Sequence, residues 1–185
     1  KSSSSSKSKT NSKKTESTDS ASSFLHLMLQ KGELAPELSG LDENGCELKI
    51  SDFRGKTLIV YFYPKDSTPG CTAEACNFRD HHSELLRAGC EVIGVSIDSA
   101  ASHLRFIAKQ ELNFHLVADT DKKWVEAFGV WGEKKMYGRS YMGTFRTTFI
   151  IDAEGRIAHV FAPSDIKTKT HAEQVLKWLE AEEKA

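Results

Sequence analysis

Cys71 is the residue of this chain whose position could most directly support chemistry. It follows a short loop that comes after an apolar run, and a helix is expected to begin at Cys71 and end near Arg87. At a helix start, the amides of the first turn and the positive end of the helix dipole favour thiolate over thiol. Since only the thiolate attacks, and a free thiol with a pKa of about 8.5 is mostly protonated at neutral pH, this position predicts a nucleophile. An inert cysteine buried at a helix start is the alternative.

Two loop residues are predicted to assist Cys71. Thr68 stands three residues before it, where the Thr68 hydroxyl could reach the thiolate or an oxygen bound beside it. Pro64 ends the apolar run, stiffens the loop and is expected to limit the access of water. Together with Cys71, these residues frame a site between a strand and a helix.

Arg146 is the candidate cation for this site. It stands just before, or at the start of, the apolar strand that ends at Ile151. A guanidinium near Cys71 would lower the pKa of the thiol and bind an oxygen of the substrate. An ion pair at the edge of a strand is the alternative, because the sequence alone does not bring Arg146 and Cys71 together.

Cys76 lies five residues after Cys71 on the same expected helix. Five residues of ideal helix give a rotation of about 140° and a Cα separation of about 8.5 Å, so the two side chains point apart. A disulfide requires Cα atoms within about 7 Å. If the two cysteines react with each other, the first turns of the helix must therefore unwind.

Zinc binding is a competing interpretation of this cysteine pair. Structural zinc sites combine two closely spaced pairs of ligands, and the chain has no second pair of cysteines with such spacing. His81 and His82 follow on the same helix, but adjacent helical residues point in different directions. The sequence therefore favours a redox site over a metal site.

The elements expected around Cys71 alternate between strand and helix. The pattern predicts an α/β thioredoxin-like fold, in which a mixed central sheet carries helices on both faces and the reactive group lies between the first core strand and its helix. The expected elements are a hairpin over 41–50 with a two-residue turn at Asn44-Gly45, strands over 57–63, 91–97 and 114–117, helices over 71–87, 99–110 and 121–128, a second hairpin over 147–151 and 156–161, and a helix over 170–182.

Composition indicates one folded domain with a polar extension. Residues 1–23 contain no apolar residue larger than Ala and carry five Lys against one Glu and one Asp, so we predict a disordered Ser/Lys-rich tail followed by a domain over 24–185. The net charge of -1 excludes a global field that would attract nucleic acid or an anionic membrane. No apolar run approaches the roughly 20 residues that span a bilayer, and no signal peptide is visible. We expect a cytoplasmic protein, although a chain that begins with Lys leaves a lost targeting segment open.

These residues together resemble the peroxiredoxin family. The spacing of Pro64, Thr68 and Cys71 is similar to its peroxidatic motif, and Arg146 matches its active-site arginine. A second cysteine five residues later is similar to the peroxiredoxin Q branch, also called bacterioferritin comigratory protein. The runs 129–132 and 139–143 add to the resemblance, which covers about residues 30–182.

The resemblance implies reduction of hydrogen peroxide and organic hydroperoxides. It implies that Cys71 is the peroxidatic and Cys76 the resolving cysteine, that thioredoxin or a similar dithiol protein supplies the electrons, and that no metal, haem or flavin cofactor is needed. It also leads us to expect a monomer or weak dimer. Cys46 and Cys90 match no position of the motif and are interpreted as structural.

Two other functions remain open from the sequence. A thiol–disulfide oxidoreductase acting on proteins is disfavoured, because two thiols five residues apart on an intact helix cannot exchange as a CxxC pair does. A non-enzymatic binding module could use the basic tail on nucleic acid, but the rest of the chain lacks a basic stripe.

Overall fold

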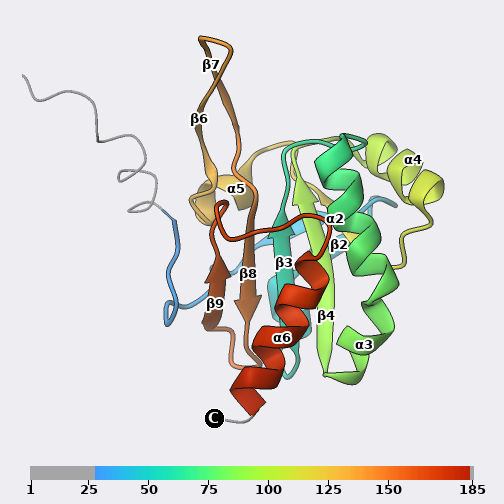
Figure 1. Cartoon of the computed structure of the whole chain (residues 1–185), viewed down its shortest axis with the longest axis vertical. Helices are drawn as coiled ribbons and strands as arrows, with labels where there is room; N and C mark the ends of the chain where they lie inside the picture. The colour runs from blue at the N-terminus through green and yellow to red at the C-terminus, as the bar shows by residue number, and fades with distance from the viewer. Residues whose placement is uncertain (1–27, 184–185) are drawn as a thin grey trace, which may run out of the picture.

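The computed structural model describes residues 28–183 (Figure 1). The expected tail over 1–23 and the expected start of the domain at residue 24 lie outside the described residues. Within residues 28–183, no helix is both long and apolar enough to cross a membrane.

A five-stranded sheet forms the centre of the molecule (Figure 1). The strands β3, β4 and β5 are parallel to one another, and β8 runs antiparallel to β3 on its other side, followed by β9. The predicted mixed sheet of a thioredoxin-like fold is therefore confirmed. In spatial order the strands are β5 (His115–Ala118), β4 (Cys90–Ser96), β3 (Thr57–Phe62), β8 (Thr147–Ile151) and β9 (Ile157–Phe161).

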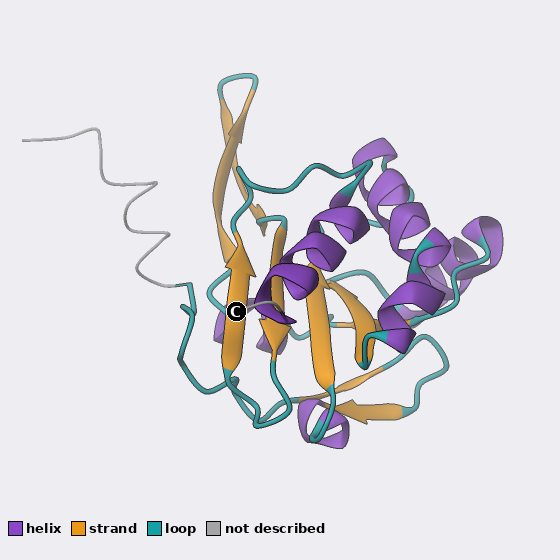
Figure 2. Ribbon diagram, turned by 60° about the horizontal axis from the view of Figure 1, so that its bottom comes forward, coloured by secondary structure: helices purple, strands orange, loops and turns teal. Residues whose placement is uncertain are grey.

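The side chains of β3 divide the interior into two apolar layers. Because successive side chains of a strand point to opposite faces, Ile59 and Tyr61 enter one layer while Val60 and Phe62 enter the other. The first layer is covered by four helices and the second by shorter elements, so the prediction of helices on both faces is confirmed with unequal cover (Figure 2). The four helices are α2 (Pro69–Asp80), α3 (His82–Arg87), α4 (Ala100–Gln110) and α6 (His171–Glu183), and the shorter elements include α5 (Lys123–Ala127) and the 3-10 turn η1 (Ile50–Phe53).

The helix that holds Cys71 differs from its predicted bounds. It begins at Pro69 rather than at Cys71, and it is interrupted at His81, which separates α2 from α3. Proline is favoured in the first turn because its missing N–H would have no helical partner there, and its fixed φ suits the helix. Cys71 is consequently the third helical residue and still lies among the free amides of the first turn. The other predicted helices and central strands are confirmed with ends that shift by at most two residues.

The first hairpin is present with a longer turn than the sequence predicted. β1 (Ser39–Leu41) pairs with β2 (Glu47–Lys49), and the register leaves residues 42–46 in the connection. The two-residue turn is therefore wrong. The Asp42 carboxylate accepts hydrogen bonds from the Asn44 and Cys46 amides, which stabilises the wider loop, and Gly45 supplies its positive φ of 77°.

The hairpin of β6 (Trp131–Met136) and β7 (Arg139–Thr144) was not predicted from the sequence. Its two strands project from the body of the molecule (Figure 1). Their residues are mostly polar or exposed, so the alternation that marks a half-buried strand is weak. The hairpin matters for the site because β7 leads directly to Arg146, which precedes β8.

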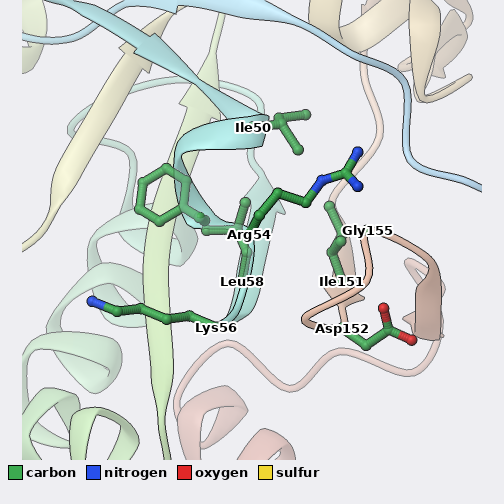
Figure 3. A pocket seen from close by; sticks show the side chains of 8 residues that line it. Ile50, Arg54, Lys56, Leu58, Ile151, Asp152 and Gly155 are labelled. Carbon is green, nitrogen blue, oxygen red and sulfur yellow. The ribbon is translucent and has the colours of Figure 1, made fainter.

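A small hollow at the start of β3 is not a substrate site. It lies between Arg54, Leu58 and Gly155 at the end of the strand remote from the β3–α2 loop (Figure 3). Its volume of about 10 Å³ has room for about one water molecule.

Gly94 on β4 should be the glycine that the core tolerates least. A Cβ atom there would lie 2.7 Å from Leu116 Cδ2 and 2.9 Å from Tyr61 Cζ, both in buried side chains. We predict that Gly94→Ala lowers the free energy of unfolding by about 1–3 kcal/mol, the usual cost of overpacking. Urea unfolding measures this. Gly143→Ala in the projecting β6–β7 hairpin is the control, because its new Cβ would lie 3.1 Å from Lys134 Cδ and 3.3 Å from Tyr141 Cε2, two side chains outside the apolar core. Equal losses in both variants would contradict the prediction.

Candidate active site

Cys71 and Arg146 meet at the N-terminal end of α2. The Arg146 Nη2 atom donates to Cys71 Sγ over 3.2 Å, and Cys71 is 1% exposed. The antiparallel pairing of β8 with β3, which places Thr147 opposite Phe62, brings Arg146 to the end of β3 where the loop to α2 begins. The predicted contact between the thiol and the guanidinium is thus present in the structure.

Glu74 is the second partner of Arg146, and the sequence analysis missed it. Arg146 Nη1 lies 2.7 Å from Glu74 Oε1, and Glu74 is fully buried. Residues three apart share a helix face, so Glu74 lies on the same side of α2 as Cys71. The guanidinium fork therefore bridges the Glu74 carboxyl group and the Cys71 sulfur, so the ion pair of the alternative interpretation and the expected contact with Cys71 occur together.

Burial sets the charge balance of this bridge. It raises the pKa of Glu74 to about 7, although the attraction and hydrogen bond of Arg146 oppose the rise. Burial alone would lower the pKa of Arg146, but Glu74 and Cys71 outweigh it, so the pKa of Arg146 is raised. Arg146 is therefore cationic at Cys71 Sγ. Glu74 Oε2 has no hydrogen-bond partner among the described residues.

Gly70 leaves room for this approach of Arg146. A Cβ atom at Gly70 would lie 3.3 Å from Arg146 Nη2, a contact tighter than most side chains make. The Pro69-Gly70-Cys71 sequence therefore combines a helix start with room for the guanidinium. The glycine next to Cys71 is visible in the sequence. The sequence does not show that Arg146, which precedes β8, occupies the space beside this glycine.

Thr68 and Pro64 lie in the loop beside Cys71, but neither contacts its sulfur by a hydrogen bond. Thr68 holds the N-cap position of α2, and its hydroxyl donates to the Lys65 carbonyl over 2.9 Å. The expected contact of that hydroxyl with the thiolate is not seen, and the Thr68 oxygen keeps only its lone pairs for a bound group. Pro64 follows β3 and is half-buried.

Cys76 lies on the same helix and faces away from Cys71. Its thiol is 3.4 Å from Gln110 Oε1 at the end of α4, and the helix is continuous from Pro69 to Asp80. Both cysteines are free. The structure thus contains the arrangement in which the Cα separation is too long for a disulfide.

Cys46 and Cys90 lie away from this arrangement. Cys46 is exposed in the β1–β2 loop, and Cys90 is buried at the start of β4. Burial, assisted by nearby acidic groups, raises the pKa of Cys90 to about 11, so Cys90 is a thiol at neutral pH. This agrees with its interpretation as a structural residue.

Lys134 and Tyr61 complete the surroundings of Cys71, and neither was singled out from the sequence. Burial, together with the charge of Arg146, lowers the pKa of Lys134, while Cys71 opposes the change, so this lysine lies in the field of the site. Tyr61 is buried, and its pKa is raised by burial and then by Glu74 and Cys71. The phenol is therefore neutral, and its ring stacks on Phe78 of α2 at 4.7 Å.

The arrangement suits nucleophilic attack by sulfur on an oxygen atom. A thiol at a helix start faces a guanidinium that can stabilise a thiolate and then an oxyanion. Metal chemistry is less well supported, because the one cluster of possible metal ligands in residues 28–183 comprises Asp42, Glu43 and His115 and includes neither Cys71 nor Cys76.

Residues 31–160 match the model of the AhpC/TSA family. Peroxiredoxin Bcp of Escherichia coli K12 is 47% identical over 151 residues, which cover 82% of this chain and 96% of that protein. Peroxiredoxin Bcp of Bacillus subtilis is 43% identical over 153 residues, which cover 83% of this chain and 96% of that protein.

Solved structures extend this similarity to the fold. The bacterioferritin comigratory protein of Xanthomonas campestris, studied as a trapped intermediate/ligand complex for its alkyl peroxide reduction activity, superposes with a TM-score of 0.76 at 38% identity and covers 83% of this chain and 98% of its own. Residues 31–160, which match the family model, include Cys71, Arg146 and the whole of α2. The chain therefore belongs to the AhpC/TSA family, in its branch of peroxiredoxin Q and bacterioferritin comigratory proteins.

Proposed function

We propose that this protein is a thiol-dependent peroxidase in which Cys71 is the peroxidatic cysteine. The observation that carries the proposal is the Arg146 guanidinium 3.2 Å from a thiol in the first turn of α2. The relatives of this chain are peroxiredoxins, and the similar Xanthomonas protein has alkyl peroxide reduction activity. Hydrogen peroxide and organic hydroperoxides are the proposed substrates.

The first step is attack of the Cys71 thiolate on the terminal oxygen of the peroxide. The S–O bond forms as the O–O bond breaks, which leaves a sulfenic acid and releases water or an alcohol after proton uptake. Negative charge moves from sulfur to the leaving oxygen, and Arg146 is placed to stabilise both ends of this transfer. The Thr68 oxygen can accept a hydrogen bond from the peroxide O–H, because its own proton is used on Lys65.

In the second step, Cys76 acts as the resolving cysteine. The Cys76 sulfur attacks the sulfenic acid, water leaves, and a disulfide forms. Because α2 is helical through both residues, its first turns must open before the sulfur atoms can meet. A dithiol protein, with thioredoxin as the proposed donor, then reduces the disulfide by exchange.

The proposal includes a location in the cytoplasm. Four free cysteines suit a reducing compartment, which favours the cytoplasm. We further propose a folded unit over 24–185 that acts as a monomer or weak dimer, with a tail over 1–23 outside the catalytic unit.

The protein disulfide oxidoreductase remains the second candidate, since it would use the same cysteines. The continuous helix disfavours it, because a dithiol exchange site needs its two thiols close together from the start, whereas attack on a peroxide needs Cys71 alone. A consumption assay with hydrogen peroxide distinguishes the two, since an oxidoreductase acting on proteins would not turn over peroxide.

Cys71→Ser is expected to abolish peroxide reduction, because the nucleophile is lost. Cys46→Ser and Cys90→Ser are the controls and should retain activity, since one residue lies in the β1–β2 loop and the other begins β4. Stopped-flow consumption of hydrogen peroxide by the reduced proteins measures this. Near-normal turnover by Cys71→Ser would overturn the assignment.

Arg146→Ala is expected to slow the reaction with peroxide by about 10²–10³-fold, the usual effect of losing one charge-stabilising donor. The Cys71 sulfur and the leaving oxygen both lose the cation that Arg146 supplies. This variant also leaves Glu74 buried without its partner, so the double variant Arg146→Ala/Glu74→Gln is needed as a control. The second-order rate constant with hydrogen peroxide should be low in both variants. A wild-type rate in the double variant would show that Arg146 has only a structural role.

Oxidation is expected to open the first part of α2. Reduced protein should protect the amides of residues 71–80 from exchange, and protein with a Cys71–Cys76 disulfide should lose protection there, because the bond cannot span an intact helix. Amide exchange of both forms, with the disulfide confirmed by mass spectrometry, tests this. Equal protection would show that the unwinding argument is wrong. If no such bond forms and Cys76→Ser keeps full turnover, Cys76 is not the resolving cysteine.

A further inference from the structure

A second buried set of polar groups lies next to the β3–α2 loop and has no role in the steps described above. Its centre is Asp66, which is 6% exposed. Asp66 Oδ1 accepts from the Tyr63 hydroxyl over 2.6 Å, and Asp66 Oδ2 lies 2.7 Å from His103 Nδ1 and 2.9 Å from the donating Ser102 hydroxyl. The Asp66 amide donates to Asp98 Oδ2 over 2.9 Å. Asp66, a residue of the β3–α2 loop, is thereby attached to α4 and to Asp98, which follows the end of β4.

The hydrogen-bond pattern joins Asp66 and His103 as a buried polar pair. His103 Nε2 lies 2.9 Å from the Val117 carbonyl, which can only accept, so Nε2 carries a proton. The Asp66 carboxyl group accepts from Tyr63 and Ser102 and has His103 Nδ1 at a third short distance, so one proton lies between Asp66 Oδ2 and His103 Nδ1. The His103 and Asp66 side chains are 0% and 3% exposed, so a buried polar group would be left unpaired if either partner were removed.

The next residue shows what this attachment holds in place. Ser67 has a φ of 63°, in the left-handed region that a residue with a side chain adopts only when its neighbours enforce it. Asp66 is fixed on one side of Ser67, and Thr68 is the N-cap residue of α2 on the other. The backbone conformation that leads into Cys71 is therefore set by the contacts of Asp66.

We propose that Asp66, through its pair with His103, is a positioning residue that fixes the loop in which Pro64 and Thr68 lie beside Cys71. This inference rests on the proposed peroxidase function. Asp66 and His103 are not catalytic residues, since they act on the loop and contact neither Cys71 nor Arg146 by a hydrogen bond. Loss of Asp66 should displace the loop that faces a bound peroxide. Cys71 should keep its place in the first turn of α2 and its contact with Arg146.

The chain offers a matched control in Asp119. This carboxylate is also buried and also fixes the start of a helix, because it accepts from the Trp124 and Val125 amides of α5. It belongs to the opposite face of the sheet, where the apolar layer contains Trp124 rather than Cys71. Asp119→Ala therefore removes a comparable buried anchor without altering the β3–α2 loop.

The test compares two reactions of Cys71 in the same reduced protein. The first is the second-order reaction with hydrogen peroxide by stopped flow, which needs the thiolate and the placed loop. The second is alkylation of Cys71 by iodoacetamide followed by mass spectrometry, which needs the thiolate but no site for peroxide oxygens. Asp66→Ala should slow the peroxide reaction by about 10²-fold, the scale of a misplaced catalytic group, without slowing alkylation. Asp119→Ala should alter neither rate, whatever it does to stability.

The conservative variant separates positioning from charge. In Asp66→Asn, the amide oxygen can still accept from Tyr63, and the amide nitrogen can donate to a neutral His103, so the loop stays attached and the peroxide rate should remain close to that of wild type. If Asp66→Ala does not fold, Tyr63→Phe removes one hydroxyl donor from Asp66 at constant ring volume, and a partial loss of the peroxide rate with unchanged alkylation is expected.

The outcomes keep the two proposals distinct. A wild-type protein that does not consume peroxide would overturn the proposed function itself. An active wild type with unchanged peroxide rates in Asp66→Ala, or in Tyr63→Phe where Asp66→Ala is unfolded, would overturn the positioning role alone. Equal losses of both reactions in Asp66→Ala, or a peroxide loss of the same size in Asp119→Ala, would reduce Asp66 to a contributor to stability.

Discussion

The bridge made by Arg146 between Cys71 and Glu74 is the interaction on which the site depends. One guanidinium donates to the sulfur over 3.2 Å and to the carboxylate over 2.7 Å. Its position is a consequence of topology, because β8 must pair antiparallel with β3 for Arg146 to reach the loop that follows β3. The sheet thus brings together a helix start and a strand start that are 75 residues apart in the chain.

The same helix must be firm enough to hold Cys71 and weak enough to release it. The second half of α2 is well attached, since Phe78 is fully buried and the Asn77 side chain accepts from the Ala172 amide of α6 over 2.6 Å. The first turn has weaker support, because the Thr68 side chain makes no capping bond to it. This unequal attachment suits local opening of the first turns while the rest of the fold remains intact.

Local signals allowed the sequence to predict the fold class and a helix that begins within two residues of its observed start, and they singled out Cys71 and Arg146 as candidate site residues. They did not predict the distance between the two residues, which depends on the β3–β8 register. Glu74 was missed because a glutamate in a helix is ordinarily a solvated residue, and only a buried cation makes its burial tolerable. The β6–β7 hairpin was missed because Glu133, Lys134 and Lys135 interrupt the alternation on which strand prediction depends.

The buried charges of the site explain why Glu74 is a suitable partner for Arg146 beside Cys71. Ionised Cys71 and ionised Glu74 would place two negative charges on one guanidinium in a site almost without solvent, which is costly. Burial raises the pKa of Glu74 to about 7, so below that pH the carboxyl group keeps its proton. Arg146 then balances the thiolate alone, and the group remains neutral as a whole. Above that pH the ionised carboxylate and the sulfur share the same cation. The carboxyl group that holds Arg146 in position therefore also limits how much of the arginine's charge reaches Cys71.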